Sequence, residues 1–263
     1  MIESVLQHLP ADHPWADKIH FFDCVESTNT LAKEMAKNGA PHGTVLIADR
    51  QTAGRGRLGR SFLSPGGMGI YMSVILRYDR AATDLMHLTC ACGVHLCNAV
   101  ESILQVRPGI KWTNDLVYEK KKLAGILTEL IFTGSGICAI VGIGLNCNQL
   151  PEDFDPTIRS IATSATMITK QRPNRGQFIA QILQQLHTMD GRLFAQQEEL
   201  MAQYRKDCIT LGQSVSILQG DTAEHGTAID VLSDGALLVR FDDGHEQIVN
   251  SGEVSIHGMY SYV

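Results

Sequence analysis

The pattern of apolar and polar positions predicts a mixed α and β domain in the longer, N-terminal part of the chain. Apolar runs rich in β-branched and aromatic residues are typical of buried strands, and polar turns separate them. Six strands are predicted on this basis, at residues 44–49, 69–77, 110–112, 116–118, 123–131 and 137–145.

Three other stretches have helical spacing. Residues 85–104 carry apolar side chains every three or four positions, as the buried face of a helix does. Residues 175–204 form a long amphipathic stretch, which we expect to be a helix broken near Gly191. A short helix is expected over residues 31–37, and the Asn-Gly-Ala-Pro sequence that follows should end it. Ser27, Thr28 and Asn29 precede this helix, either as its N-cap or also as a polar recognition edge.

The chain changes character after Cys208. Short alternating strands are expected at 214–218, 227–231, 236–241 and 253–256, and Gly-containing turns separate them. Strands of this length and spacing favour a small separate β-barrel. We place the boundary at 208–212, which divides the chain into residues 1–208 and 209–263.

A long glycine-rich loop separates the first two predicted strands. Within it, Gly54-Arg-Gly-Arg-Leu-Gly59 matches the G-x-G-x-x-G dinucleotide fingerprint. The match is rejected, because Arg60-Ser-Phe-Leu-Ser-Pro cannot open the helix that the fingerprint needs. Glycines allow close backbone approach and guanidinium groups bind phosphate or carboxylate, so the loop is interpreted as a lid over an anionic ligand. The alternative is a solvated, mobile basic loop.

Composition and charge narrow the function. The chain has 263 residues, 44% hydrophobic and 19% charged, which is an ordinary globular balance. Its net charge of −6 argues against broad duplex binding. Five arginines and no acid lie within residues 50–78, whereas residues 213–263 carry eight acids and one arginine. Positive charge is therefore concentrated, as a site for a small anionic ligand requires.

Cysteine usage and the apolar runs indicate a reducing cytoplasm. Seven scattered cysteines are not a disulfide framework. The N-terminus does not resemble a signal peptide, and the apolar runs are too short to span a membrane. Three cysteines and two histidines in one predicted helix suggest buried core thiols rather than a metal site, namely Cys90, Cys92, Cys97, His87 and His95.

Five segments, taken in order, resemble bacterial biotin protein ligases of the monofunctional type. They are Glu26-Ser-Thr-Asn-Thr30, Gln51-Thr-Ala-Gly-Arg-Gly-Arg-Leu-Gly-Arg60, Lys111-Trp-Thr-Asn-Asp-Leu116, Lys122-Leu-Ala-Gly-Ile-Leu127 and Gly142-Ile-Gly-Leu-Asn146. Singly, each also fits a turn or a packing role; together they are far more specific. The resemblance runs from Phe21 to the C-terminus. It implies an α+β fold, with a mixed-sheet biotin/lipoate ligase-type catalytic domain followed by a small SH3-like β-barrel.

The implied reaction has two half-steps. Biotin carboxylate attacks the α-phosphate of MgATP, giving biotinyl-5′-AMP and pyrophosphate. A lysine of the biotin carboxyl carrier protein of acetyl-CoA carboxylase then attacks the activated carbonyl and releases AMP. Cationic groups must neutralise the two anions as they meet, and a loop that closes over the mixed anhydride must keep water out.

The resemblance also implies roles for individual residues. The implied catalytic residues are Lys122 as a charge stabiliser, Arg57 as a stabiliser of the adenylate, and Asp115 as a carboxylate that orients the carrier lysine. The implied biotin-binding residues are Ser27, Thr28, Asn29, Gln51, Arg55, Gly56, Arg57, Lys122, Gly125 and Gly142. The implied ATP-binding residues are Arg57, Arg60, Phe62, Asn114, Lys122 and Asn146, and the magnesium ligands are left open.

Three departures from the family pattern matter. Thr113 stands where the family often has proline, and Phe62 stands where it often has tryptophan. Only 26 residues precede Ser27, too few for the winged helix-turn-helix that repressor members carry. We therefore expect an enzyme without repressor function.

Two other functions compete with this one. A lipoate–protein ligase shares the fold and the adenylation chemistry, whereas a nucleotide or RNA binder would use the arginine loop without catalysis. We expect biotin, ATP and a carrier protein as partners, with no nucleic acid and no membrane, and we leave open whether the protein is a homodimer.

Overall fold

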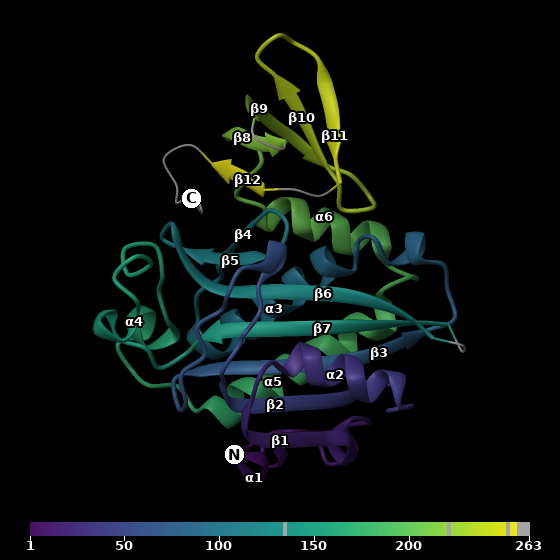
Figure 1. Ribbon diagram of the computed structural model, residues 1–263, viewed down its shortest axis with the longest axis vertical. Coiled ribbons are helices and arrows are strands. Elements are labelled where there is room, and N and C mark those ends of the chain that lie inside the picture. Colours follow the sequence, from purple (N-terminus) through teal and green to yellow (C-terminus); the bar gives the residue numbers. More distant parts are fainter. Residues whose placement is uncertain (134–135, 220–221, 251–252, 257–263) are drawn as a thin grey trace.

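The computed structural model describes residues 1–133, 136–219, 222–250 and 253–256. Its larger part is built on a seven-stranded sheet in the order β1-β2-β3-β7-β6-β5-β4 (Figure 1). The strands are β1 (Ile19–Val25), β2 (Thr44–Gln51), β3 (Gly69–Tyr78), β4 (Gly109–Lys111), β5 (Asp115–Tyr118), β6 (Lys121–Thr133) and β7 (Gly136–Asn146). β1 and β2 are parallel and all other neighbours are antiparallel, so the sheet is mixed, as expected.

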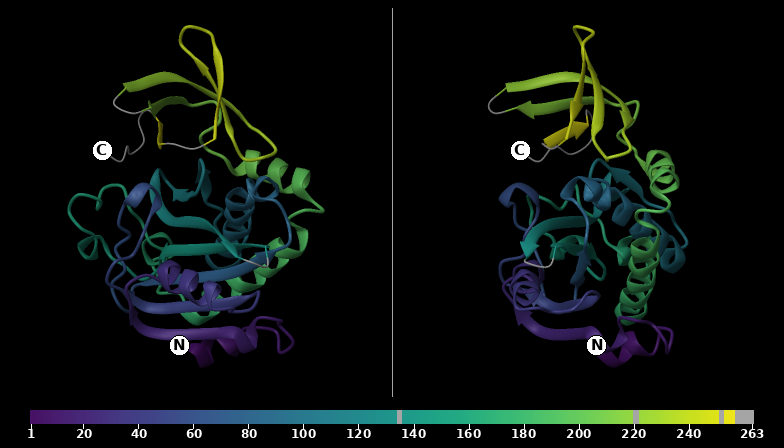
Figure 2. Two further views of the ribbon diagram at one scale, coloured as in Figure 1. Left: turned by 45° about the vertical axis from the view of Figure 1, so that its right-hand side comes forward. Right: turned by 90° about the vertical axis from the view of Figure 1, so that its right-hand side faces the viewer.

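Helices cover both faces of this sheet (Figure 2). α3 (Leu88–Leu104), α5 (Arg175–Arg192) and α6 (Gln197–Asp207) lie on one face, and α2 (Thr28–Lys37) lies on the other. Alternate residues of β2 serve the two sides: Val45 and Ile47 join the large core, and Leu46 joins a small core with α2. Two short helices complete this part, α1 (Ile2–Leu6) and α4 (Ala165–Thr169).

The elements predicted from the strongest apolar patterns agree with the observed elements to within a few residues. All six predicted strands of this sheet are present, and the expected break in the long helical stretch falls just after Gly191, between α5 and α6. The predicted helix over 85–104 begins three residues later, at Leu88, because Ala82–Leu85 forms a separate 3₁₀ turn. β1 was not predicted. It carries His20 and Asp23, and it lies at the edge of the sheet, where β2 is its one partner among the described strands.

The C-terminal part is a five-stranded antiparallel sheet in the order β11-β10-β9-β8-β12. Its strands are β8 (Ser214–Gln219), β9 (Thr222–Val231), β10 (Leu237–Phe241), β11 (Glu246–Val249) and β12 (Glu253–Ile256). It sits above β4, β5 and α6 (Figure 1), and Trp112 Nε1 donates to the Gly235 carbonyl at 2.9 Å. The expected small all-β part is therefore confirmed, although β11 was missed and residues 257–263 lie outside the described part of the chain.

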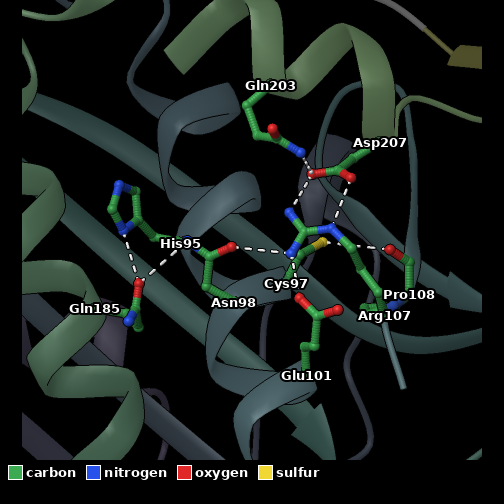
Figure 3. Close-up of polar contacts among 9 residues, drawn as sticks. All are labelled: His95, Cys97, Asn98, Glu101, Arg107, Pro108, Gln185, Gln203 and Asp207. Atoms are coloured by element: carbon green, nitrogen blue, oxygen red, sulfur yellow. Dashed lines mark hydrogen bonds and ion pairs between the residues drawn. The ribbon is translucent and has the colours of Figure 1, made fainter. Parts of the chain in front are cut away.

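A polar network joins the helices next to the start of β4 (Figure 3). The Arg107 guanidinium donates to both carboxylate oxygens of Asp207 at the end of α6, and also to Asn98 and Glu101 on α3. The hydrogen bond with Asp207 raises the pKa of Arg107 above its ordinary value. This network fixes the end of α6, from which the chain enters the C-terminal sheet.

The cysteines of α3, its residue His95 and the N-cap residue His87 are all buried in the protein core or bonded to neighbouring segments. Cys90, Cys92 and Cys97 are buried, as expected, and burial raises the pKa of Cys90 to about 12. His87 and His95 contact the Leu193 carbonyl and the Gln185 side chain. Within the described residues, no group of three His, Cys, Asp or Glu is arranged to hold a metal ion. None of the helices described has the length and apolar character needed to cross a membrane.

His42 gives the fold a testable pH dependence. Its Nε2 lies 2.9 Å from Asp190 Oδ2, and Asp190 Oδ1 accepts a hydrogen bond from Tyr78. The hydrogen bond to Asp190 raises the pKa of His42 above 6.5, although burial opposes this. The pair therefore stabilises the fold fully below pH 6.5 and loses this contribution as the pH rises through the folded-state pKa.

We expect His42→Gln to lower the melting temperature most at pH 6 and progressively less above pH 7, measured by thermal unfolding across pH. The matched control is His20→Gln, at an exposed position on β1. A His42→Gln effect that stayed constant or grew with rising pH would contradict the assignment.

Candidate active site

One cavity of about 210 Å³ brings together nearly all the residues that the sequence singled out. Its lining includes Ser27, Thr28, Asn29, Gln51, Arg55, Gly56, Arg57, Arg60, Phe62, Asn114, Asp115, Lys122, Gly125 and Gly142. Lys111 is a further lining residue, with 4% of its surface exposed. Among the described lining residues, Asp115 is the one carboxylate against five cations, Arg55, Arg57, Arg60, Lys111 and Lys122. The cavity is therefore suited to an anionic ligand.

The register of the sheet builds the floor of this cavity. Tyr71, Gly144, Gly125, Asp115 and Lys111 are paired in one row across β3, β7, β6, β5 and β4. Side chains of paired residues point to the same face of a sheet, so the two glycines leave a gap in the middle of the row. Polar and charged side chains can then lie directly on the sheet.

Those gaps are occupied by the site's own side chains. A Cβ on Gly144 would lie 2.7 Å from the Phe62 ring, and one on Gly125 would lie 3.3 Å from Lys122 Nζ. A Cβ on Gly142, in the next row, would lie 2.0 Å from Asn29 Oδ1. The in-strand glycines are thus needed for close approach, without a bulge in the β6–β7 pairing. That Gly125 and Gly142 also border biotin stays a prediction.

The polar end of the cavity is the N-terminus of α2. Ser27 caps the helix, with its Oγ accepting from the Thr30 N–H, as the sequence predicted. The main-chain N–H of Thr28 donates to Gln51 Oε1 at 2.8 Å, and the Thr28 hydroxyl lies 3.1 Å from the same oxygen. Capping and recognition can therefore coexist, because Ser27 and Thr28 also line the cavity.

The charged end is a chain of four side chains. Arg57 Nη1 donates to Asn114 Oδ1 at 2.9 Å, and Asn114 Nδ2 donates to Asp115 Oδ1 at 3.2 Å. Lys122 Nζ lies 2.8 Å from the same Asp115 oxygen. Burial lowers the pKa of Arg57, and the nearby Asp115 carboxylate opposes that shift. Two cations are thus held next to one carboxylate at one end of the cavity.

The glycine-rich loop folds back on itself as a narrow hairpin, and most of its residues are exposed. Antiparallel bridges join Gln51 with Ser64 and Arg55 with Ser61. The only regular turn between them is the short 3₁₀ segment Arg57–Gly59, so no helix follows Gly59 and rejection of the dinucleotide fingerprint is confirmed. The loop carries Arg57 to the β4–β5 turn, which is consistent with a lid. Residues 112 and 113 in that turn are joined by a cis peptide bond.

Two features were not expected from the sequence. Asn146 is absent from the described lining, and its side-chain amide donates to the carbonyls of Lys122 and Thr163. That Asn146 also contacts the nucleotide stays a prediction. Sequence reasoning also gave no role to Lys111, Ser73 or Glu129. A serine within the apolar run of β3 and a lysine within the short strand β4 were the available signals.

Comparisons with known proteins agree with this geometry. A model of the Biotin/lipoate A/B protein ligase family matches residues 21–146, and one of the Biotin protein ligase C terminal domain matches residues 210–256. The bifunctional ligase/repressor BirA of Bacillus subtilis is 32% identical over 236 residues, which cover 88% of this chain and 72% of that protein.

For two further similar proteins, the match covers a larger share of their length. A biotin–[acetyl-CoA-carboxylase] ligase of Mycobacterium tuberculosis is 33% identical, over 87% of this chain and 85% of that protein. The structure of a biotin protein ligase from Aquifex aeolicus in complex with biotin and ATP superposes with a TM-score of 0.78. It is 29% identical and covers 91% of this chain and 98% of its own.

Proposed function

The chain belongs to the biotin protein ligase family, and on this premise we propose that it activates biotin with ATP and transfers it to a carrier protein. The products of activation are biotinyl-5′-AMP and pyrophosphate, and the acceptor is a lysine of the biotin carboxyl carrier protein of acetyl-CoA carboxylase. The observation that carries the proposal is one cavity with a hydrogen-bonding end at α2 and a cationic end at Lys122 and Arg57.

The two ends of the cavity suit the two ends of biotin. The ureido ring offers one carbonyl acceptor and two N–H donors, which Ser27, Thr28, Asn29 and Gln51 can match. The carboxylate then points to Lys122 and Arg57. Binding at both ends fixes the reacting oxygen relative to the nucleotide, which converts a bimolecular encounter into an oriented one.

In the first half-step, a biotin carboxylate oxygen bonds to the α-phosphorus of ATP and the bond to pyrophosphate breaks. Lys122 and Arg57 offset the charge of the two approaching anions and of the developing phosphorane-like oxygens. Arg60, Phe62 and Asn114 line the side that remains for the nucleotide. Asn146 donates to the Lys122 carbonyl and so helps to fix the main chain next to this side of the cavity.

Magnesium fits this site only together with ATP. Mg²⁺ in nucleotide sites is held by one or two carboxylates and by the substrate's phosphates. Asp115 is the one carboxylate among the described lining residues, and it pairs with Lys122. Asn114 turns its amide nitrogen to Asp115 and its oxygen to Arg57. When bound, the ion would neutralise phosphate charge, and Asp115 is the carboxylate that could hold it together with the phosphates.

In the second half-step, the carrier lysine's amine attacks the activated carbonyl, and the carbonyl–oxygen bond to AMP breaks. Asp115 is placed to accept a hydrogen bond from that amine. This requires its ion pair with Lys122 to loosen, which happens when the ligand's carboxylate or phosphate takes over Lys122. The arginine loop closes over the anhydride and keeps water away from it.

A biotin-dependent exchange of pyrophosphate into ATP tests the proposal. We expect the purified protein with MgATP to exchange labelled pyrophosphate when biotin is added, and not when lipoate is added. Exchange that responds to lipoate and not to biotin would favour a lipoate–protein ligase. Salt-sensitive RNA binding without any exchange would favour the non-catalytic alternative.

We propose residues 1–208 as the catalytic domain and 209–263 as the SH3-like domain, supported by the change from the mixed sheet to the antiparallel sheet after α6. That the protein lacks repressor function and that it is cytoplasmic stay predictions. Whether it forms a homodimer stays open.

A further inference from the structure

A partly buried polar cluster lies beside the hydrogen-bonding end of the cavity, between α2 and β6. Glu129 Oε1 pairs with Lys33 Nζ at 2.9 Å, and Glu129 Oε2 accepts from Asn29 Nδ2 at 3.0 Å. Asn29 is 4% exposed and lines the cavity, whereas Glu129 and Lys33 do not appear in its lining. The carboxylate therefore acts on the cavity through Asn29.

The two hydrogens of the Asn29 amide are both committed. One is donated to Glu129 and the other to the Leu127 carbonyl at 3.1 Å. The amide oxygen then has to face the opposite way, and it accepts from Ser73 Oγ at 2.6 Å. A carboxylate can only accept hydrogen bonds, so an ionised Glu129 permits one orientation of this amide and forbids its flipped form.

This orientation is passed along a chain of hydroxyl and amide groups. Ser73 Oγ also lies 2.8 Å from the Thr28 hydroxyl. Because each hydroxyl has one hydrogen, Ser73 can donate to Asn29 only if it accepts from Thr28, whose hydroxyl then no longer donates to Gln51. Gln51 Oε1 faces Thr28, and Gln51 Nε2 donates to Ser64 at 2.8 Å. Ser64 in turn donates to the Phe62 carbonyl in the arginine loop.

Glu129 stays ionised at neutral pH. Burial disfavours its charged form, but hydrogen bonds from Lys33 and Asn29 outweigh burial and hold the pKa below its ordinary value. One charge thus favours a single orientation of the Asn29 amide, and with it the donor and acceptor roles of the Ser73 and Thr28 hydroxyls.

We propose that Glu129, held by Lys33, is a positioning residue that sets the donor and acceptor pattern with which the cavity recognises the ureido ring of biotin. The inference rests on the proposed function. A fixed pattern of this kind discriminates strongly against a ligand whose ring carries a donor where biotin has its carbonyl acceptor. Glu129 is therefore a specificity determinant that does not touch the ligand.

The test compares Glu129→Gln with the wild-type protein in the biotin-dependent exchange reaction. Glutamine has nearly the same size, but its amide can donate as well as accept. The substitution therefore relaxes the constraint that Glu129 places on the Asn29 amide and leaves the Leu127 carbonyl as the remaining one. We expect the KM for biotin to rise about tenfold or more, with kcat changed less than about threefold. The preference for biotin over 2-iminobiotin, in which an imine replaces the ring carbonyl, should narrow. Lys33→Met keeps the carboxylate and should give the same changes in weaker form.

The matched control is Glu34→Gln, at an exposed position on α2, which should leave KM, kcat and the preference unchanged. Thermal melting of each variant identifies loss of fold. An unchanged KM, or equal losses for biotin and 2-iminobiotin, would overturn the inference and reduce Glu129 to a structural residue. Failure of the wild-type protein to exchange with biotin would instead overturn the proposed function, so the two failures are distinguishable.

Discussion

Replacing Lys122 with methionine is expected to lower the rate of biotinyl-adenylate formation by at least about 10²- to 10³-fold, the loss typical when one preorganised charge-stabilising donor is removed. Lys122 Nζ lies at the charged end of the cavity, directly above Gly125 and beside Asp115. No other lysine of the Lys120-Lys121-Lys122 run lines the cavity among the described residues. The measurement is biotin-dependent pyrophosphate exchange at saturating biotin and ATP.

The matched control for this variant is Lys121→Met, one residue away and outside the described lining. It should retain near-normal exchange. Because Lys122→Met removes the cation that lies 2.8 Å from the Asp115 carboxylate, which is 8% exposed, some loss of stability is expected as well. Circular dichroism and melting curves separate the two effects, and Lys122→Arg supplies a variant that keeps the charge. Near-wild-type exchange by a folded Lys122→Met protein would refute the assigned role.

Gly142→Ala is expected to raise the KM for biotin about 10- to 100-fold, with a smaller effect on kcat. The added Cβ would lie 2.0 Å from Asn29 Oδ1, closer than any real contact, so Asn29 must move. Its movement breaks hydrogen bonds to Leu127, Ser73 and the charged Glu129, each with a net contribution of about 0.5 to 3 kcal/mol. Since about 1.4 kcal/mol is tenfold in affinity, the expected range follows.

The control for this variant is Gly191→Ala, because Gly191 lies in α5 and a Cβ there would have no heavy atom within 4 Å. Biotin affinity is measured by titration calorimetry alongside the exchange kinetics. A Gly142→Ala protein that binds biotin as tightly as the wild type would show that Asn29 has no part in recognition.

The sequence located the strands and the charged motifs, because both leave local signals. Long β-branched runs such as β7 predict buried strands, and Ser27 before a helical segment predicts an N-cap. Strand β1 left no such signal, since polar residues interrupt it and it is an edge strand of the described sheet. Without the family resemblance, the lysine triplet likewise did not reveal which of its members enters the site.

The pairings of the site could not be predicted from local patterns. Lys122 reaches Asp115 across a register shift between β5 and β6, and a shift of this kind has no clear mark in the sequence. Glu129 acts on Asn29 from 100 residues away in the chain. The family resemblance implied Gly125 and Gly142 as biotin-binding residues, but it did not show that a Cβ at either position would meet the protein's own side chains, Lys122 and Asn29.

Mass spectrometry of a biotin carboxyl carrier domain, incubated with this protein, biotin and MgATP, tests the central claim most directly. The account predicts that the carrier gains the mass of one biotinyl group on a single lysine, and that the gain disappears when ATP is left out. A carrier that remains unmodified while the enzyme is folded, or that is modified with lipoate in place of biotin, would contradict it.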